Sequence, residues 1–142
     1  MNNFLKTLIL YAFLFLIEII FVFIGVLLFD SSKIDLYNIR RAWLGSGLWN
    51  FWRVLFYGLP FIVLYFLLFK YFGNIKLYKP LLFSLFNLLI YVSLSVLSRV
   101  IWGKNVPLPP EGIMFWITCI AVFSAPNILG QIPYFKKLME SL

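Results

Sequence analysis

Four long runs of apolar residues alternate with short polar segments along the chain. The interior of each run contains at most one charged side chain. Because a helix rises about 1.5 Å per residue, roughly 20 apolar residues cross the hydrocarbon core of a membrane, which is about 30 Å thick. The pattern therefore predicts a single transmembrane domain over residues 1–142, with helices at about 5–29, 48–72, 80–102 and 112–130.

The segments between these runs are short or polar, which favours antiparallel neighbours. In the first connection, Ser32 with Asp35 is typical of a helix N-cap, and Gly45 is a suitable end for a short helix at the membrane surface. The second connection is a tight turn around Gly73, and the third is rich in proline. We therefore predict an all-α fold: an integral membrane bundle of four transmembrane helices, with short connections and a short interfacial helix in the first loop.

Two prolines lie inside the predicted helices. Pro60 is near the middle of the second helix, where it removes a backbone hydrogen bond and is expected to kink the helix. Pro126 with Asn127 is expected to interrupt the end of the fourth helix. The tail over residues 131–142 is short, basic and amphipathic, which predicts a segment lying on the membrane surface.

Composition supports membrane insertion. The chain is 63% hydrophobic and 12% charged, whereas a soluble domain is about 45–50% apolar and about 25% charged. The net charge of +7 comes from basic residues that mostly flank the apolar runs, where they face lipid headgroups, so we expect membrane lipids and no nucleic acid as partners. Cys119 is the single cysteine, which excludes an intrachain disulfide.

Basic residues also indicate an orientation. Four spans place both termini on one side, together with six lysines: Lys6, Lys70, Lys76, Lys79, Lys136 and Lys137. The other side carries Lys33, Arg40, Arg41 and Lys104, plus Arg53 and Arg99 when residues near the membrane are counted. By the positive-inside rule, six against four or six favours cytoplasmic termini. We place the chain in a bacterial cytoplasmic membrane.

Polar residues inside the helices fall on single stripes at 100° per residue. The predicted stripe comprises Tyr11 and Glu18 on the first helix and Ser84, Asn87, Tyr91, Ser95 and Ser98 on the third. Small and hydroxylated residues are common where membrane helices pack, so the preferred interpretation is a set of interhelical contacts. The alternative is that these stripes line a polar cavity.

Glu18 lies at the centre of its apolar run, where an acid requires a partner. Arg53 is about 5 residues, or roughly 8 Å, from the centre of the second run, whereas Arg99 is about 12 Å from the centre of the third. Depth therefore predicts an intramembrane Glu18–Arg53 charge pair. The pair would either fix two helices in register, take part in binding or proton handling, or meet a polar residue of a partner subunit.

All four arginines lie toward the side of the first and third loops. The planar guanidinium group suits bidentate contact with phosphate. Arg40, Arg41 and Arg99 are therefore candidate contacts for an anionic headgroup.

Motifs for catalysis are missing from the chain. Histidine is absent, and the short glycine motif at residues 45–47 lacks the remainder of a phosphate-binding loop. Glu18 is the one acid at depth, so neither paired carboxylates nor a metal-ligand cluster is available there. We predict no catalytic residue, no metal site and no cofactor, and hence not an enzyme.

Two functions agree with this pattern. The leading hypothesis is a non-catalytic accessory or assembly subunit of a larger membrane complex, whose partners are other membrane subunits or further copies of the chain. The alternative is a small transporter, flippase or lipid-binding protein that handles an anionic, phosphate-bearing lipid or solute through a Glu18/Arg53 polar core.

Overall fold

The protein is described by a computed structural model over residues 1–29, 33–105 and 110–142. Within these ranges the chain forms helices and no strand, which confirms the predicted all-α class. The elements are α1 (Asn3–Phe29), α2 (Leu36–Phe72), α3 (Lys79–Trp102), the 3₁₀ turn η1 (Gly103–Asn105), α4 (Ile113–Leu129) and α5 (Pro133–Glu140).

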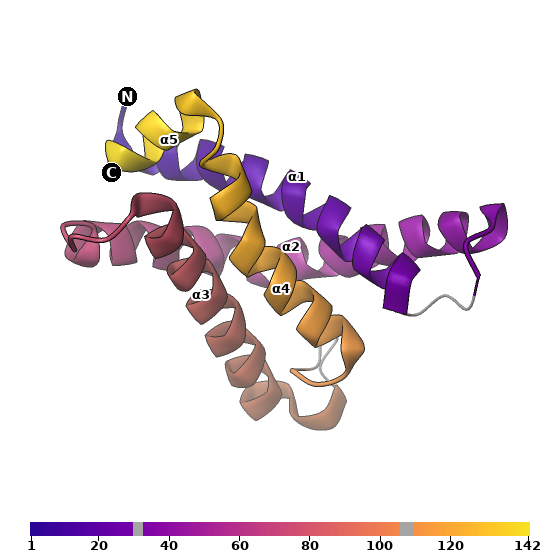
Figure 1. Ribbon diagram of the computed structural model, residues 1–142. Helices are drawn as coiled ribbons and strands as arrows, with labels where there is room; N and C mark the ends of the chain where they lie inside the picture. Colours follow the sequence, from indigo (N-terminus) through magenta and orange to yellow (C-terminus); the bar gives the residue numbers. More distant parts are fainter. Residues whose placement is uncertain (30–32, 106–109) are drawn as a thin grey trace.

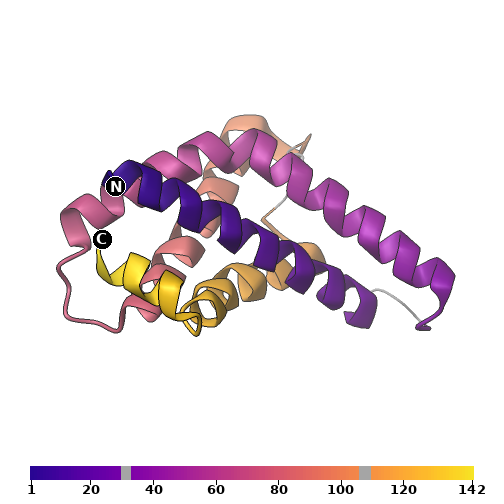
Figure 2. The ribbon, with the colours of Figure 1, turned by 90° about the horizontal axis from the view of Figure 1, so that it is seen from above.

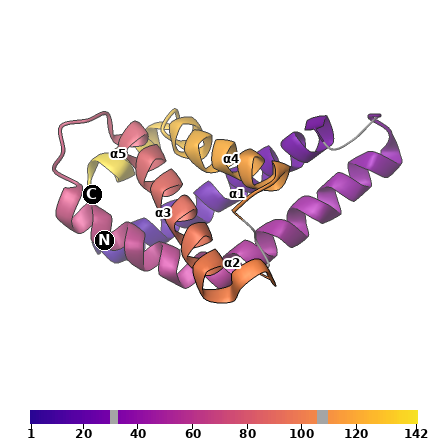
Figure 3. The ribbon, with the colours of Figure 1, turned by 90° about the horizontal axis from the view of Figure 1, so that it is seen from below.

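The helices form two antiparallel hairpins that cross obliquely (Figure 1). One hairpin is α1 with α2 and the other is α3 with α4, and α4 also packs along α1. Figures 2 and 3 show that the two chain termini lie near one another and near the α2–α3 connection, and that the start of α2 projects beyond the α3–α4 hairpin. The molecule therefore has one end capped by α5 and one end where α2 extends alone.

Among the described residues, three helical segments are long and apolar enough to cross a membrane: Asn3–Phe29, Leu36–Phe72 and Lys79–Asn105. The pair α4 and α5, which is bent by 100°, qualifies as a fourth only when it is counted as one broken span. Large apolar side chains cover the outside, among them Leu59 at 79% exposure and Trp116 at 65%. These features are compatible with an integral membrane protein.

The second helix differs most from the sequence prediction. The prediction of a separate interfacial helix that ends at Gly45 is wrong, because α2 runs without interruption from Leu36 through Gly45 to Phe72. A glycine inside a helix costs only about 1 kcal/mol, and Ala42 and Ser46 on either side of Gly45 are buried and give the helix a continuous packed face.

The predicted N-cap lies partly outside the described residues. Asp35 does cap α2, because its carboxylate accepts a hydrogen bond from the Asn38 backbone N–H at 2.8 Å. Ser32 lies outside the described residues.

The end of the fourth helix also differs from expectation. Helix α4 continues through Pro126 to Leu129, and the sharp turn follows at Gly130. A Cβ atom at Gly130 would lie 2.5 Å from the Pro80 side chain, so the missing side chain permits close approach of α3. Helix α5 then packs against α1 and α3 and buries Phe135 in the bundle.

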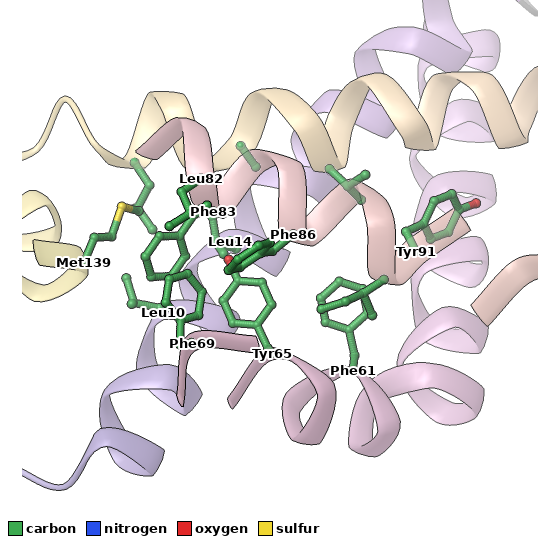
Figure 4. Close-up of a cluster of buried hydrophobic side chains, with 14 of the residues drawn as sticks. Leu10, Leu14, Phe61, Tyr65, Phe69, Leu82, Phe83, Phe86, Tyr91 and Met139 are labelled. Atoms are coloured by element: carbon green, nitrogen blue, oxygen red, sulfur yellow. The ribbon is translucent and has the colours of Figure 1, made fainter. Parts of the chain in front are cut away.

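Aromatic side chains form the core at the end that holds the termini (Figure 4). Tyr65 and Phe69 of α2 point toward Phe83 and Phe86 of α3, and Met139 of α5 closes the cluster. The Phe69 and Phe83 rings stack with centroids 3.9 Å apart, and the Tyr65 and Phe83 centroids are 5.4 Å apart. Close packing of such rings supplies dispersion energy that does not depend on water.

Candidate functional site

An ion pair occupies the centre of the molecule. The Arg53 guanidinium donates through Nη2 to Oε2 of Glu18. Both residues are almost completely buried, at 3% and 2% exposure. The two charges that were predicted to pair from their depth in the apolar runs are thus in contact. Their ion pair joins α1 to α2.

Asn87 of α3 completes the coordination of Glu18. Its Nδ2 donates to Glu18 Oε1 at 2.8 Å and to the Val122 carbonyl of α4 at 2.7 Å. Each of the two amide protons has one acceptor, and each carboxylate oxygen has one donor. The four-residue polar cluster, defined as Glu18, Arg53, Asn87 and the Val122 carbonyl, therefore ties together the four longest helices.

Aromatic rings surround the guanidinium. Its Cζ lies 5.5 Å from the Phe15 ring centroid and 6.0 Å from the Tyr91 centroid, within reach of cation–π attraction. Its second terminal nitrogen, Nη1, is buried and has no hydrogen-bond partner within the described residues. The same holds for Asn50 Oδ1, Asn87 Oδ1 and Ser95 Oγ. The polar centre thus holds more hydrogen-bonding capacity than these residues use among themselves.

Two further polar contacts join helices around the cluster. Tyr57 and Ser98 share a hydrogen bond of 2.7 Å between α2 and α3. The Trp49 indole N–H donates to Thr118 Oγ1 at 2.9 Å and joins α2 to α4. Sequence reasoning missed Trp49 as a polar partner, although a tryptophan N–H in an apolar helix requires an acceptor.

The predicted polar stripe lies largely at these helix interfaces. Ser84, Asn87, Tyr91, Ser95 and Ser98 are all buried. Ser84 accepts from Asn127 of α4 at 2.8 Å, a second partner that sequence reasoning missed. Tyr11 is half-buried, with its ring 5.2 Å from that of Phe61.

The three outer arginines do not form one site. Arg99 donates to Glu111 Oε1 at 2.8 Å. Arg40 and Arg41 are exposed near the start of α2, where they line a shallow hollow to which Arg99 does not contribute. A carboxylate already neutralises Arg99, so the structure separates it from Arg40 and Arg41, and contact of the three with a headgroup stays a prediction.

Within the described residues, no group of three or more histidine, cysteine, aspartate or glutamate side chains lies close enough together to hold a metal ion.

No protein-family model, no curated protein and no solved structure matches the chain. Function is therefore inferred from the side chains and their contacts.

Proposed function

We propose that the chain is a multi-pass protein that crosses a bacterial cytoplasmic membrane four times, with both termini in the cytoplasm. In this arrangement α1, α2, α3 and α4 are the spans, and α5 turns back beneath the bundle. We further propose that it is a non-catalytic accessory or assembly subunit of a larger membrane complex.

The observation that carries this proposal is how Glu18 is used. Both of its oxygens accept from other helices, Oε2 from Arg53 and Oε1 from Asn87. An acid engaged in this way is suited to fixing helix register and poorly placed to attack or protonate a substrate. The buried polar cluster holds the helices together, so the outer surface is the part of the molecule available to bind partners.

A band of aromatic side chains on that surface favours contact with another protein. Trp52 stacks on Phe56 with centroids 5.6 Å apart, and Phe56 meets Trp102 edge to face at 6.2 Å, so the band bridges α2 and α3. Trp52 and Trp102 remain 43% and 58% exposed. Large aromatic residues are enriched at the energetic centres of protein interfaces.

Native mass spectrometry after extraction in mild detergent tests the proposal. We expect the chain to leave the membrane with a stoichiometric partner, and the double variant Trp52→Ala/Trp102→Ala to lose it. Trp116→Ala is the control, because Trp116 is an exposed tryptophan on α4, outside the band. A lone monomer from the native membrane would overturn the subunit proposal.

One observation favours the second candidate, a small transporter, flippase or lipid-binding protein for an anionic, phosphate-bearing lipid or solute. Arg53 Nη1 and Ser95 Oγ are buried without a partner within the described residues, and an unsatisfied buried group costs about 1–3 kcal/mol. A phosphate oxygen near Arg53 would satisfy such donors. The test is transport by the reconstituted protein. If Glu18→Gln and Arg53→Gln each abolish transport while the fold is retained, this candidate is favoured over the first.

A further inference from the structure

We propose that the hollow near the start of α2 binds the headgroup of an anionic phospholipid. The hollow is lined by Tyr37, Arg40, Arg41, Leu44 and Gly45. The inference depends on insertion of the chain in a membrane, and it holds whether the protein is a subunit or a transporter.

Helical spacing explains how these residues come together. Tyr37, Arg40 or Arg41, and Leu44 follow one another at intervals of three or four positions, so they share one face of α2. A Cβ atom at Gly45 would meet nothing within 4 Å, and the missing side chain leaves the floor of the hollow open. The result is two guanidinium groups and a phenol around an accessible surface.

The charges of these two arginines are not neutralised by the described part of the chain. Both side chains are exposed, and the ion pairs found there are Arg53–Glu18 and Arg99–Glu111. Two adjacent guanidinium groups offer several donors to the oxygens of a phosphodiester, and the Tyr37 hydroxyl adds another. The hollow is thus complementary to a single negative phosphate group.

Depth identifies the phosphate as that of a lipid. Helix α2 runs from Leu36 to Phe72, so Arg53 lies at the middle of the observed helix and not about 8 Å from it, as the shorter predicted run suggests. Its ion pair with Glu18, at the centre of the first apolar run, makes Arg53 the reference for the midplane on α2. Arg40 and Arg41 precede Arg53 by 13 and 12 residues, which is about 18–20 Å of helix. Headgroups occupy roughly 15–22 Å from the midplane, and a tilt of about 20° shortens the distance by less than a tenth.

The apolar neighbours of the hollow fit the rest of the lipid. Leu44 lines it, and Leu48 one turn closer to the membrane centre is 61% exposed. A phospholipid whose phosphate contacts Arg40 and Arg41 would lay its acyl chains along these side chains. A soluble anion would gain nothing from them.

Titration of the full-length protein in mild detergent tests the site. Native mass spectrometry would count bound phosphatidylglycerol and, in a parallel titration, phosphatidylcholine. An arginine near the membrane surface contributes about fivefold in affinity for anionic lipid, so Arg40→Gln/Arg41→Gln should weaken phosphatidylglycerol binding about 30-fold at low ionic strength. Binding of phosphatidylcholine should stay within twofold.

Arg99→Gln is the matched control for charge. It removes the same side chain from the same protein, but Glu111 already neutralises Arg99, so we expect less than a twofold change. If Arg99→Gln lost as much affinity for phosphatidylglycerol as Arg40→Gln/Arg41→Gln, net charge alone would explain the effect and the proposal would be overturned. Unchanged phosphatidylglycerol binding in the double variant would overturn it as well.

Two further measurements separate a lipid site from other anion binding. Gly45→Leu keeps both arginines and fills the floor, and it should weaken phosphatidylglycerol binding at least fivefold. Gly47→Leu should not, although a Cβ atom there also meets open space. Millimolar glycerol phosphate should fail to displace the lipid. Displacement by this soluble headgroup, or equal behaviour of the two glycine variants, would contradict a lipid site in the hollow.

Discussion

Two regions of the interior, the aromatic core near the termini and the polar cluster at the centre, are held together in different ways. Near the termini, Tyr65, Phe69 and Phe83 pack ring against ring, and no single contact decides the geometry. At the centre, Glu18 and Arg53 each depend on a specific partner on another helix. Packing energy is spread over many atoms, whereas a buried charge is tolerable only while its counter-charge is present. The first interior should tolerate a change of shape and the second should not tolerate a change of charge.

Loss of the carboxylate should have the largest effect. Glu18→Gln preserves shape but leaves the Arg53 guanidinium without a counter-charge, and breaking a buried pair costs about 3–5 kcal/mol. Arg53→Gln should cost less, because it removes the guanidinium, the group of the pair that cannot lose its charge. The free energy of unfolding in mixed micelles measures both.

The double variant Glu18→Gln/Arg53→Gln is the control for that experiment. It removes both charges, so it should recover at least half of the stability lost by Glu18→Gln alone. A double variant as unstable as the sum of the two single variants would show that the ion pair does not couple α1 to α2.

The aromatic interior should respond to lost volume instead. Phe83 is fully buried against Phe69 and Tyr65, so Phe83→Ala should cost about 3 kcal/mol by leaving a cavity. Phe83→Leu keeps most of the volume and should cost less than about 1.5 kcal/mol. The same unfolding assay decides between them, and equal losses in the two variants would contradict a packing role.

The effect of changing Asn87 should fall between that of losing a buried charge and that of losing a neutral contact, because Asn87 contributes hydrogen bonds without charge. Asn87→Leu keeps the volume but removes the donors to Glu18 and to the Val122 carbonyl. Hydrogen bonds between membrane helices average about 0.6 kcal/mol, so we expect a loss of about 1 kcal/mol in the unfolding assay. A loss as large as that of Glu18→Gln would mean that Asn87, and not Arg53, is the essential partner of the acid.

Much of the secondary structure follows from the sequence, because the long apolar runs and the polar segments between them determine it. Helices α1, α3 and α4 begin and end within two residues of the predicted bounds. The error in α2 has a clear cause: Gly45 is a possible helix end, but whether the helix ends depends on the packing of Ala42 and Ser46, which the sequence does not display.

The polar centre was predictable only where depth is informative. Depth along two runs pairs Glu18 with Arg53, and the pair is present in the structure. Depth does not reveal that Asn87 reaches both Glu18 and α4, because that contact depends on how the two hairpins cross. For the same reason the sequence does not reveal that the Trp49 indole donates to Thr118.

The smallest effect should come from a single neutral hydrogen bond. Tyr57→Phe keeps the ring and removes the hydroxyl that meets Ser98 at 2.7 Å, so it should cost about 0.6 kcal/mol. Tyr134→Phe is the control, because Tyr134 is an exposed tyrosine on α5, and it should leave the unfolding free energy unchanged. Because the aromatic ring stays in place, this pair isolates a neutral hydrogen bond from packing. A Tyr57→Phe loss close to that of Glu18→Gln would remove the distinction between a charged contact and a neutral one in the polar centre.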